Sequence, residues 1–269
     1  MSSSRSPRDG SRQPAQKHAR SPRRHTHSSS RPGGPCWLAG LHVVQAVMEN
    51  PDRTVLRLLL TDAARDELTQ RLSVPLPSSV EIVERARLDQ VVGADIVHQG
   101  AAVQVEPLEA ISIEDALLRP GPVLVLDQVT DPRNAGAILR SAAAFGAACI
   151  VMQDRNAPPE STVLAKAASG ALERVPLVRV VNLSRTIVQL QEQGIWTVGL
   201  DADGPVLDGA SFSGRRVALV LGAEGSGLRR LTRETCDEVA SLKMAGGMES
   251  LNVSVAAAVG LYELVRHKG

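Results

Sequence analysis

Three segments of this sequence place polar residues directly after apolar runs, at positions where a parallel sheet would bring them together. Asn134 and Arg140 follow the run VLVLD, and Glu224 lies among glycines after the run VALVL. In the third segment, MAGGMESLNVSVAAAVG, Ser250 and Asn252 precede a run of Ala, Val and Gly. Ligands of open α/β sheets bind beyond the carboxyl ends of the strands. The three segments therefore predict one crevice that holds a small polar ligand.

Each of these residues also has a purely structural interpretation. Asn134, Ser250 and Asn252 belong to the residue types that cap helices, and capping is compatible with ligand binding. Arg140 lies in the otherwise apolar stretch ILRSAAAFG, so it either forms a structural ion pair or faces a substrate. The glycines around Glu224 allow close approach of a ligand, but they also suit a flexible turn with an exposed acid.

The elements that must position these segments alternate regularly after residue 122. Strands are predicted at 123–127, 148–152, 175–180, 195–200, 217–221 and 239–243, and helices at 134–145, 161–168, 183–193, 228–235 and 252–266. This alternation predicts an α/β domain with a parallel sheet covered on both faces. The pattern alone indicates an ordinary doubly wound fold.

A smaller α/β unit is predicted at residues 36–109, and an acidic linker at 110–121 separates it from the domain at 122–269. Helices are expected at 40–50, 62–70 and 84–92, and strands at 54–60, 80–83 and 102–108. Asp62 is expected to cap the second of these helices. Pro120-Gly121-Pro122 marks the end of the linker.

The charge of the chain is distributed unevenly. Residues 1–35 carry eight Lys or Arg and one acid, a net charge of +7, whereas the remainder carries −6. This Ser/Arg/Pro-rich tail resembles a transit peptide in composition, but it lacks the apolar residues for an amphipathic helix. We therefore expect an uncleaved disordered arm that tethers the protein to a polyanion. Aromatic residues make up 2% of the chain, which argues against a base-stacking platform.

Cysteine usage and hydropathy exclude several classes of protein. Cys36, Cys149 and Cys236 lie far apart without the spacing of a metal or redox motif, and Cys149 falls in an apolar run. These features predict a reducing compartment, no disulfide bonds and no metal. The sequence lacks a run of 18 apolar residues, so we expect a cytoplasmic protein with no membrane span.

The three polar segments, in this order and at these spacings, closely resemble the signature motifs of the SpoU (TrmH) family of RNA ribose 2′-O-methyltransferases in the SPOUT superfamily. The resemblance covers about residues 123–265. The stretches WLAGLHVVQAV and HQGAAV resemble the family's L30e-like substrate-binding domain. The layout is most similar to members that methylate a guanosine ribose in bacterial 23S rRNA, or to their mitochondrial counterparts. This resemblance implies an α/β fold with a C-terminal trefoil knot at roughly residues 217–260, which sequence patterns cannot reveal.

The resemblance also implies roles for particular residues and a cofactor, S-adenosylmethionine. It places Asn134 and Arg140 as the active-site pair, with Glu224, Ser250 and Asn252 beside them. Cofactor contacts are implied for Gly199, Gly222, Leu242, Met244, Ser250 and Leu251. The third motif usually begins Ile-Pro-Met, and here it reads Leu-Lys-Met, which puts the rigidity of that loop in doubt. No metal is implied.

We therefore predict an S-adenosylmethionine-dependent RNA 2′-O-methyltransferase, most similar to the enzymes that act on 23S rRNA. Arg140 is expected to assist loss of the ribose hydroxyl proton, most simply by stabilising the developing alkoxide. A tRNA methyltransferase and a non-catalytic RNA-binding assembly factor of the same fold are the alternatives. An unrelated nucleotide-binding enzyme is disfavoured because G-x-G-x-x-G is absent. The last helix is apolar on nearly every face, which predicts a homodimer through the C-terminal domain.

Overall fold

The computed structural model describes residue 1, residues 33–246 and residues 250–267 of the chain. Most of the basic tail, with Gly247, Met248 and Glu249, therefore lies outside the described residues. The predicted disordered arm falls almost entirely there, as does the glutamate of the third motif. Residues 31–269 form one unit by their contacts.

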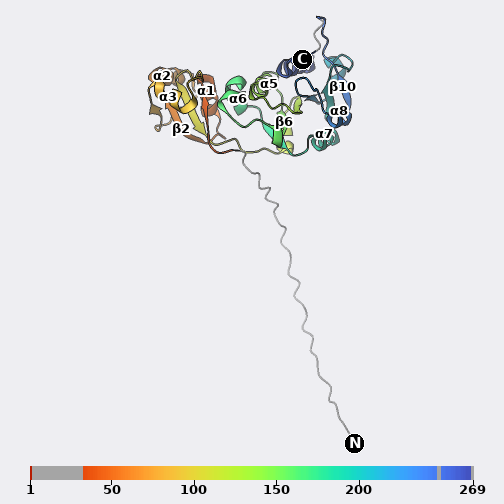
Figure 1. The fold of residues 1–269 in the computed structure, drawn as a ribbon, viewed down its shortest axis with the longest axis horizontal. Helices are drawn as coiled ribbons and strands as arrows, with labels where there is room; N and C mark the ends of the chain where they lie inside the picture. Colours follow the sequence, from red (N-terminus) through yellow and green to blue (C-terminus); the bar gives the residue numbers. More distant parts are fainter. Residues whose placement is uncertain (2–32, 247–249, 268–269) are drawn as a thin grey trace. The chain divides into compact units, whose positions relative to one another are not determined.

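The first part of this unit is a four-stranded mixed sheet with the strand order β1-β4-β2-β3 (Figure 1). Strand β4 runs antiparallel to β1 and β2, and β3 runs parallel to β2. Helices α1 and α2 contribute to one core, and α3 packs on the other face of the sheet through Leu88. The elements are β1 Cys36–Ala39, α1 Leu41–Glu49, β2 Val55–Leu60, α2 Asp62–Arg71, β3 Glu81–Ile82, α3 Arg85–Val92 and β4 Ala101–Val105.

The second part is a six-stranded sheet with the order β10-β8-β9-β5-β6-β7. Every neighbouring pair of its strands is parallel, which confirms the predicted parallel α/β sheet. The elements are α4 Ile113–Leu117, β5 Val123–Leu126, α5 Pro132–Ala144, β6 Cys149–Gln153, η1 Asp154–Asn156, α6 Thr162–Ala168, η2 Ala171–Glu173, β7 Leu177–Val180, α7 Leu183–Glu192, β8 Trp196–Leu200, η3 Gly209–Phe212, β9 Val217–Leu221, α8 Arg230–Thr235, β10 Glu238–Ala240 and α9 Val253–Val265.

Both faces of this sheet are covered, as its continuous apolar strands require. Leu124 and Leu126 of β5 point into a core shared with α5, α6 and α9. Val123 and Val125 point to the opposite face, where α4 and α7 cover the sheet. The alternation of side chains along one strand thus divides the apolar interior into two layers.

Two predicted helix caps were wrong by one turn or less. Thr61, not Asp62, caps α2, because the Thr61 hydroxyl accepts a hydrogen bond from the amide of Ala64 at 3.3 Å. Helix α5 begins at Pro132 and is capped by Asp131, so Asn134 lies inside the first turn and its side chain is free for other contacts.

Strand β1 and helix α4 were not predicted from the sequence. Both are very short, and α4 lies in the segment that was interpreted as a linker. The Ser112 hydroxyl caps α4 by accepting from the amide of Asp115, and Ala116 is fully buried against the large sheet. Tertiary packing, rather than periodicity, therefore determines these elements.

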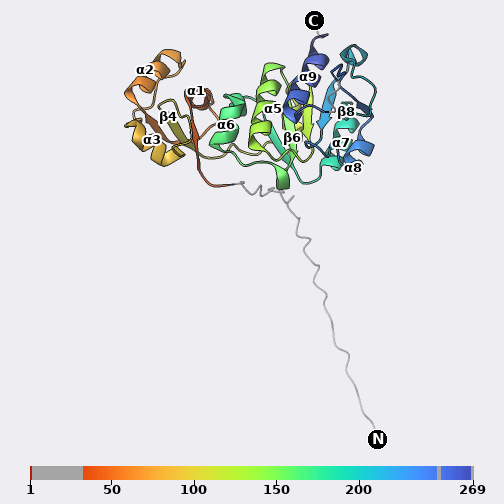
Figure 2. The same cartoon turned by 45° about the horizontal axis from the view of Figure 1, so that its top comes forward.

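Helix α9 buries one face and exposes another, and it lies beside α5 (Figure 2). Its buried residues are Val253, Ala257, Gly260, Leu261 and Leu264. Its exposed apolar side chains are Val255, Val259 and Tyr262, which share one side of the helix. Among the described residues, no helix is both long and apolar enough to cross a bilayer.

Candidate active site

Four neighbouring strands of the large sheet end at the same level. Leu126 of β5 pairs with Leu221 of β9, which pairs with Leu200 of β8, which pairs with Ala240 of β10. The segments that leave these ends hold nearly all the polar residues selected from the sequence. The predicted convergence of the three segments on one edge of the sheet is therefore confirmed.

A polar cluster of Asn134, Glu224 and Asn252 joins the three segments at this edge. The Asn134 Nδ2 atom donates to Glu224 Oε1 at 3.3 Å, and Asn252 Nδ2 donates to Asn134 Oδ1 at 3.1 Å. Asn252 Nδ2 also donates to Glu224 Oε1. The side chains of Glu224 and Asn252 are exposed, so the cluster faces solvent with one carboxylate at its centre. Such a cluster offers hydrogen bonds to hydroxyl and amino groups of a ligand.

Helix caps fix two members of the polar cluster. Asn252 is the N-cap of α9, where its Oδ1 accepts from the Ser254 amide at 2.9 Å while its Nδ2 faces the cluster. Asn134 lies in the first turn of α5, which Asp131 caps through the Arg133 amide at 2.8 Å. The capping interpretation of Asn252 is therefore confirmed, and its ligand-facing role stays a prediction that the cap allows, because its two terminal atoms make different contacts.

Asp127 is a structural residue at this edge that the sequence interpretation missed. It follows β5, is fully buried, and its Oδ1 accepts from Arg229 Nε at 2.7 Å. Its amide donates to Leu221 O at 2.8 Å, which links the ends of β5 and β9. The next residue, Gln128, adopts a left-handed φ of 65°, which turns the chain toward α5. The sequence signal that could have identified Asp127 is its position as an acid directly after an apolar strand.

Gly222 and Gly199 were selected as cofactor contacts, and the structure gives each a packing role. A Cβ on Gly222 would collide with the backbone of Gly227 and Leu228, so only glycine permits this turn after β9. Gly199 lies within β8, where a Cβ would come within 2.8 Å of Leu228. Gly222 lies at the open edge, whereas Gly199 is buried in the sheet. Their contacts with a cofactor stay predictions.

The other selected cofactor residues flank the same edge. Leu242 follows β10 and is half-buried against the core. The side chains of Met244 and Leu251 are 36% and 39% exposed. Ser250 is exposed, and its hydroxyl makes no hydrogen bond within the described residues. Half-buried and exposed apolar side chains beside a polar cluster suit a ligand with both an apolar ring and polar groups.

Arg140 lies outside the polar cluster. It is exposed on α5, six residues and about 9 Å of helix beyond Asn134. It lines a cavity with His42 of α1 and Arg174, which follows η2. The Arg140 side chain forms no hydrogen bond or ion pair with any described residue, so the structural ion pair considered from the sequence is absent from this part of the chain.

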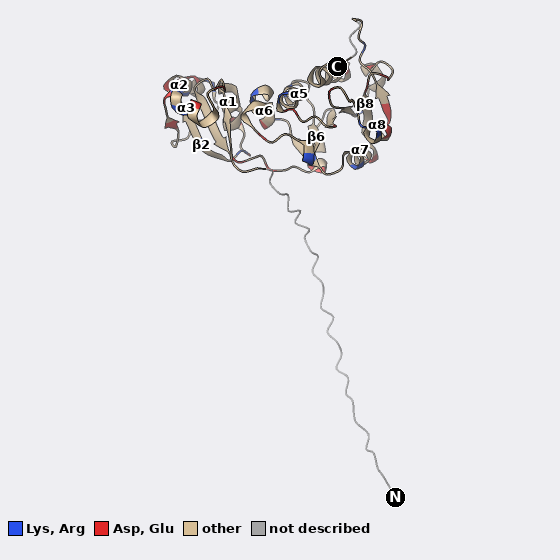
Figure 3. Ribbon diagram, viewed as in Figure 1, with Lys and Arg blue, Asp and Glu red and all other residues tan. Residues whose placement is uncertain are grey.

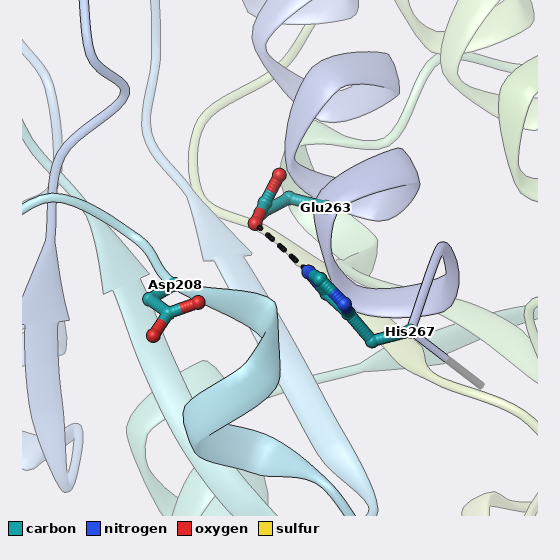
Figure 4. A group of neighbouring side chains, drawn as sticks. All are labelled: Asp208, Glu263 and His267. Atoms are coloured by element: carbon teal, nitrogen blue, oxygen red, sulfur yellow. Dashed lines mark ion pairs between the residues drawn. The ribbon is translucent and has the colours of Figure 1, made fainter.

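A second group of titratable side chains lies at the end of α9, away from the polar cluster. Asp208, Glu263 and His267 bring potential metal ligands within 4.8 Å of one another (Figure 4). Arg266 already contacts the Glu263 carboxylate at 2.7 and 2.8 Å, and its hydrogen bonds lower the pKa of Glu263. Asp208 caps η3. These contacts give Glu263 and Asp208 structural roles, and we assign no metal to the group.

Comparison with protein families identifies the chain. Residues 121–262 match the model of the SpoU rRNA Methylase family, and residues 37–110 match the model of the RNA 2′-O ribose methyltransferase substrate-binding domain. The chain belongs to the SpoU rRNA methylase family. It is an RNA 2′-O-methyltransferase, and the polar cluster lies within the methylase part of this SpoU protein.

Relatives of this SpoU protein cover almost the same length of chain. The 23S rRNA (guanosine-2′-O-)-methyltransferase RlmB of Vibrio vulnificus (strain CMCP6) is 42% identical over 243 residues, 86% of this chain and 97% of that one. The RlmB of Escherichia coli (strain K12) is 42% identical over 238 residues, 85% of this chain and 97% of that one.

Solved structures share the fold of this SpoU protein. The SpoU methyltransferase AviRb from Streptomyces viridochromogenes, in complex with AdoMet, has a TM-score of 0.72 at 24% identity and covers 87% of this chain and 91% of its own. An AdoMet-bound rRNA methyltransferase from Sinorhizobium meliloti has a TM-score of 0.70 at 22% identity, with 87% of each chain covered.

Proposed function

We propose that this protein transfers the methyl group of S-adenosylmethionine to the ribose 2′-oxygen of a guanosine in 23S rRNA. The observation that supports this substrate is the 41–44% identity to relatives named for that reaction, which extends over 95–97% of their length. This chain itself matches both a substrate-binding family model and a methylase family model. S-adenosylmethionine supplies the electrophilic methyl group when it is bound.

The residues at the edge of the large sheet fit this cofactor. Gly222 leaves the turn after β9 without a side chain, and Leu242, Met244 and Leu251 offer apolar contacts for the adenosine. We assign cofactor binding to these residues and to Ser250 and Gly199. The polar cluster of Asn134, Glu224 and Asn252 would then hold polar groups of the cofactor or the ribose.

We assign Arg140 to the ribose hydroxyl, the group that accepts the methyl in this reaction. A ribose hydroxyl is a very weak acid, and its oxygen gains negative charge as it attacks the methyl group. A guanidinium stays protonated, so it stabilises this charge rather than removing the proton itself. Alignment of the oxygen with the methyl group supplies much of the remaining acceleration.

We infer that the working enzyme is a homodimer. Arg140 stands apart from the polar cluster of its own chain, and α9 exposes the apolar stripe of Val255, Val259 and Tyr262. Tyr262 lies near Phe145 at the end of α5, with ring centroids 6.1 Å apart, so the stripe adjoins the helix that bears Arg140. Pairing of two chains over this region would cover the stripe and bring Arg140 to the cluster of the second copy.

We also infer the trefoil knot, the L30e-like character of residues 36–109 and cytoplasmic action. Close backbone approaches support the knot: a Cβ on Gly204 would lie 2.7–2.8 Å from the backbone of Ala240, and a Cβ on Gly209 would collide with the backbone of Glu263. Segments that pass this closely are expected where one loop threads another. The cytoplasm is where a bacterial rRNA substrate is made.

The test is methylation of defined RNA by the purified protein. The protein is incubated with S-adenosylmethionine and a 23S rRNA transcript, and the RNA is digested to nucleosides for mass spectrometry. We expect 2′-O-methylguanosine at one position, located by reverse-transcription stops at low nucleotide concentration. Methylation of tRNA but not 23S rRNA would favour the tRNA enzyme. RNA binding without methylation of either would favour a non-catalytic assembly factor.

A further inference from the structure

A small cavity lies where the substrate-binding domain meets the methylase domain. We call it the basic pocket; its volume is about 150 Å³, and His42, Gln45 and Glu49 of α1 face Arg140 and Arg174 across it. Its space equals that of about five water molecules. No Phe, Tyr or Trp lines the basic pocket, so it offers no large aromatic face for a stacked base and suits a single polar group.

The two arginines and the histidine of the basic pocket lack side-chain partners among the described residues. Arg140, Arg174 and His42 form no hydrogen bond or ion pair through their side chains with any residue the structure describes. Figure 3 shows basic segments, in blue, on α5 and on the neighbouring helix α6. Two guanidinium groups that line one cavity can together bind an external anion through charge-assisted hydrogen bonds.

Two acids lie in or next to the basic pocket, and each accepts hydrogen bonding from another side chain. Glu173 precedes Arg174, but its carboxylate accepts from Arg53 at 2.7 Å and from Asn50 at 2.8 Å, and its side chain is 3% exposed. Among the described residues that line the pocket, Glu49 is the one carboxylate, and its Oε1 accepts from Gln45 at 3.1 Å. Glu173 is thus held by other partners, and Glu49 is the carboxylate that shares the basic pocket with Arg174.

The walls of the basic pocket are held together by a close contact. Gly170, with φ of 88°, brings the turn after α6 against α1, where an added Cβ would lie 2.9 Å from Ala46. A larger residue there would push the domains apart. The two domains thus present His42 and the two arginines at a fixed separation, which lowers the cost of binding one shared ligand.

We propose that the basic pocket binds a backbone phosphate of the substrate RNA, held by Arg174 and His42 next to Arg140. This inference rests on the proposed function, because RNA is the anion and Arg140 connects the pocket to methyl transfer. A phosphate contact fixes the register of the strand without reading its sequence. Arg174 and His42 are therefore positioning residues, and the target nucleotide is set elsewhere.

The test compares Arg174→Ala and His42→Ala with Arg185→Ala, which removes an exposed arginine from α7 on the opposite face of the sheet. We expect Arg174→Ala to weaken binding of a 23S rRNA transcript and to raise its KM about tenfold or more, with smaller changes in kcat. The slope of log affinity against log salt should fall by about one. Arg174→Lys should restore much of the affinity, whereas Arg185→Ala should resemble the wild type.

Two results would overturn the proposal. One is an unchanged RNA affinity and salt slope in Arg174→Ala with normal folding by circular dichroism. The other is binding of inorganic phosphate that depends on Arg174 while RNA binding does not, since the anion would then be a free one. RNA affinity can be measured even if the wild-type protein does not methylate RNA. A failure of the proposed methylation is therefore distinguishable from a failure of phosphate binding in the basic pocket.

Discussion

Arginine side chains in this protein differ in whether the fold supplies an acceptor for them. Arg53 contacts two glutamates, Arg229 contacts the buried Asp127, and Arg216 donates to three backbone carbonyls. Arg140 and Arg174 receive no such acceptor from the described residues. The first group stabilises the fold, whereas the second is available to an external anion.

Replacement of Arg140 tests its assignment to the ribose hydroxyl that accepts the methyl. Arg140→Ala should lower kcat at least about 100-fold, since loss of one preorganised donor to a developing oxyanion has effects of that order. The affinity for S-adenosylmethionine, measured by calorimetry, should stay close to wild type. Arg140→Lys should also be poor, because an ammonium lacks the planar fork. Wild-type turnover in either variant would contradict the assignment.

Asn252 allows capping to be separated from the polar cluster. Asp is as good an N-cap as Asn, so Asn252→Asp should keep the cap of α9. It replaces the Nδ2 donor to Glu224 and Asn134 with a carboxylate, and we expect methyl transfer to fall about 10- to 100-fold. The control Asn252→Ala should also cost about 1 kcal/mol in unfolding free energy. Full activity of Asn252→Asp would show that the cluster is dispensable.

The buried thiols predict a loss of stability at alkaline pH. Burial raises the pKa of Cys149 to about 11 and that of Cys236 to about 12, from the ordinary 9.0, and nearby Asp237 and Asp127 add to the effect at Cys236. The folded chain therefore keeps protons that the unfolded chain releases above pH 9, so the free energy of unfolding falls as pH rises from 9 to 11. Urea titrations should show a smaller decline for Cys149→Ala. Equal declines would contradict this explanation.

At the scale of elements, the short helix α6 and the turn after it join the two domains. The Thr162 hydroxyl donates to Trp37 O at 2.6 Å, and Lys166 Nζ donates to Val97 O at 2.9 Å. Arg53 reaches from the corner between α1 and β2 to the glutamates around η2. A helix that covers the large sheet is thus also the support for the substrate-binding domain.

The contacts of Arg53 with Glu160 and Glu173, the Arg53 junction, should contribute strongly to the stability of the fold. The Arg53 side chain is fully buried, and its partners Glu160 and Glu173 are 12% and 3% exposed. Although burial opposes its charge, hydrogen bonds and attraction from both glutamates raise the pKa of Arg53, so the junction persists over the working pH range. Arg53→Met leaves two buried carboxylates unpaired and should cost about 3–5 kcal/mol by urea unfolding.

A matched control for Arg53→Met is Arg230→Met. Arg230 pairs with Glu234 on an exposed face of α8, with side chains 84% and 55% exposed, so its loss should leave stability close to wild type. Adding Glu173→Gln to Arg53→Met should recover part of the loss, because one buried charge is then neutral. Equal effects of the two arginine replacements would show that burial of the junction is unimportant.

At the scale of the whole molecule, α9 determines the expected assembly. Its buried side faces the sheet and α5, so a charge at Ala257, which is fully buried, would disrupt the fold of a single chain. The exposed stripe gives the cleaner test. Val259→Glu should produce a monomer by light scattering and lose activity, whereas Val188→Glu, at an exposed valine of α7, should change neither. An active monomer of the wild-type chain would contradict the dimer.

The sequence by itself determined the elements with strong periodicity and the residues at their ends. Apolar runs of four to six residues between helices specified the parallel sheet, and polar residues after three of these runs specified the sheet edge at which the polar cluster lies. Residue type and order placed Asn134, Glu224 and Asn252 among the candidates at this edge. Local patterns suffice here because both strand burial and helix starts are encoded within about a dozen residues.

The tertiary structure alone decided which of the candidate residues meet. It joined Asn134, Glu224 and Asn252, which lie up to 118 residues apart, and it left Arg140 with α1 of the other domain. It also determined strand β1 and helix α4, which are too short to show a periodic pattern in the sequence. The physical reason is that contacts between distant segments depend on strand order and on close backbone approach at residues such as Gly170 and Gly222. Neither property is expressed in the local pattern of apolar and polar residues.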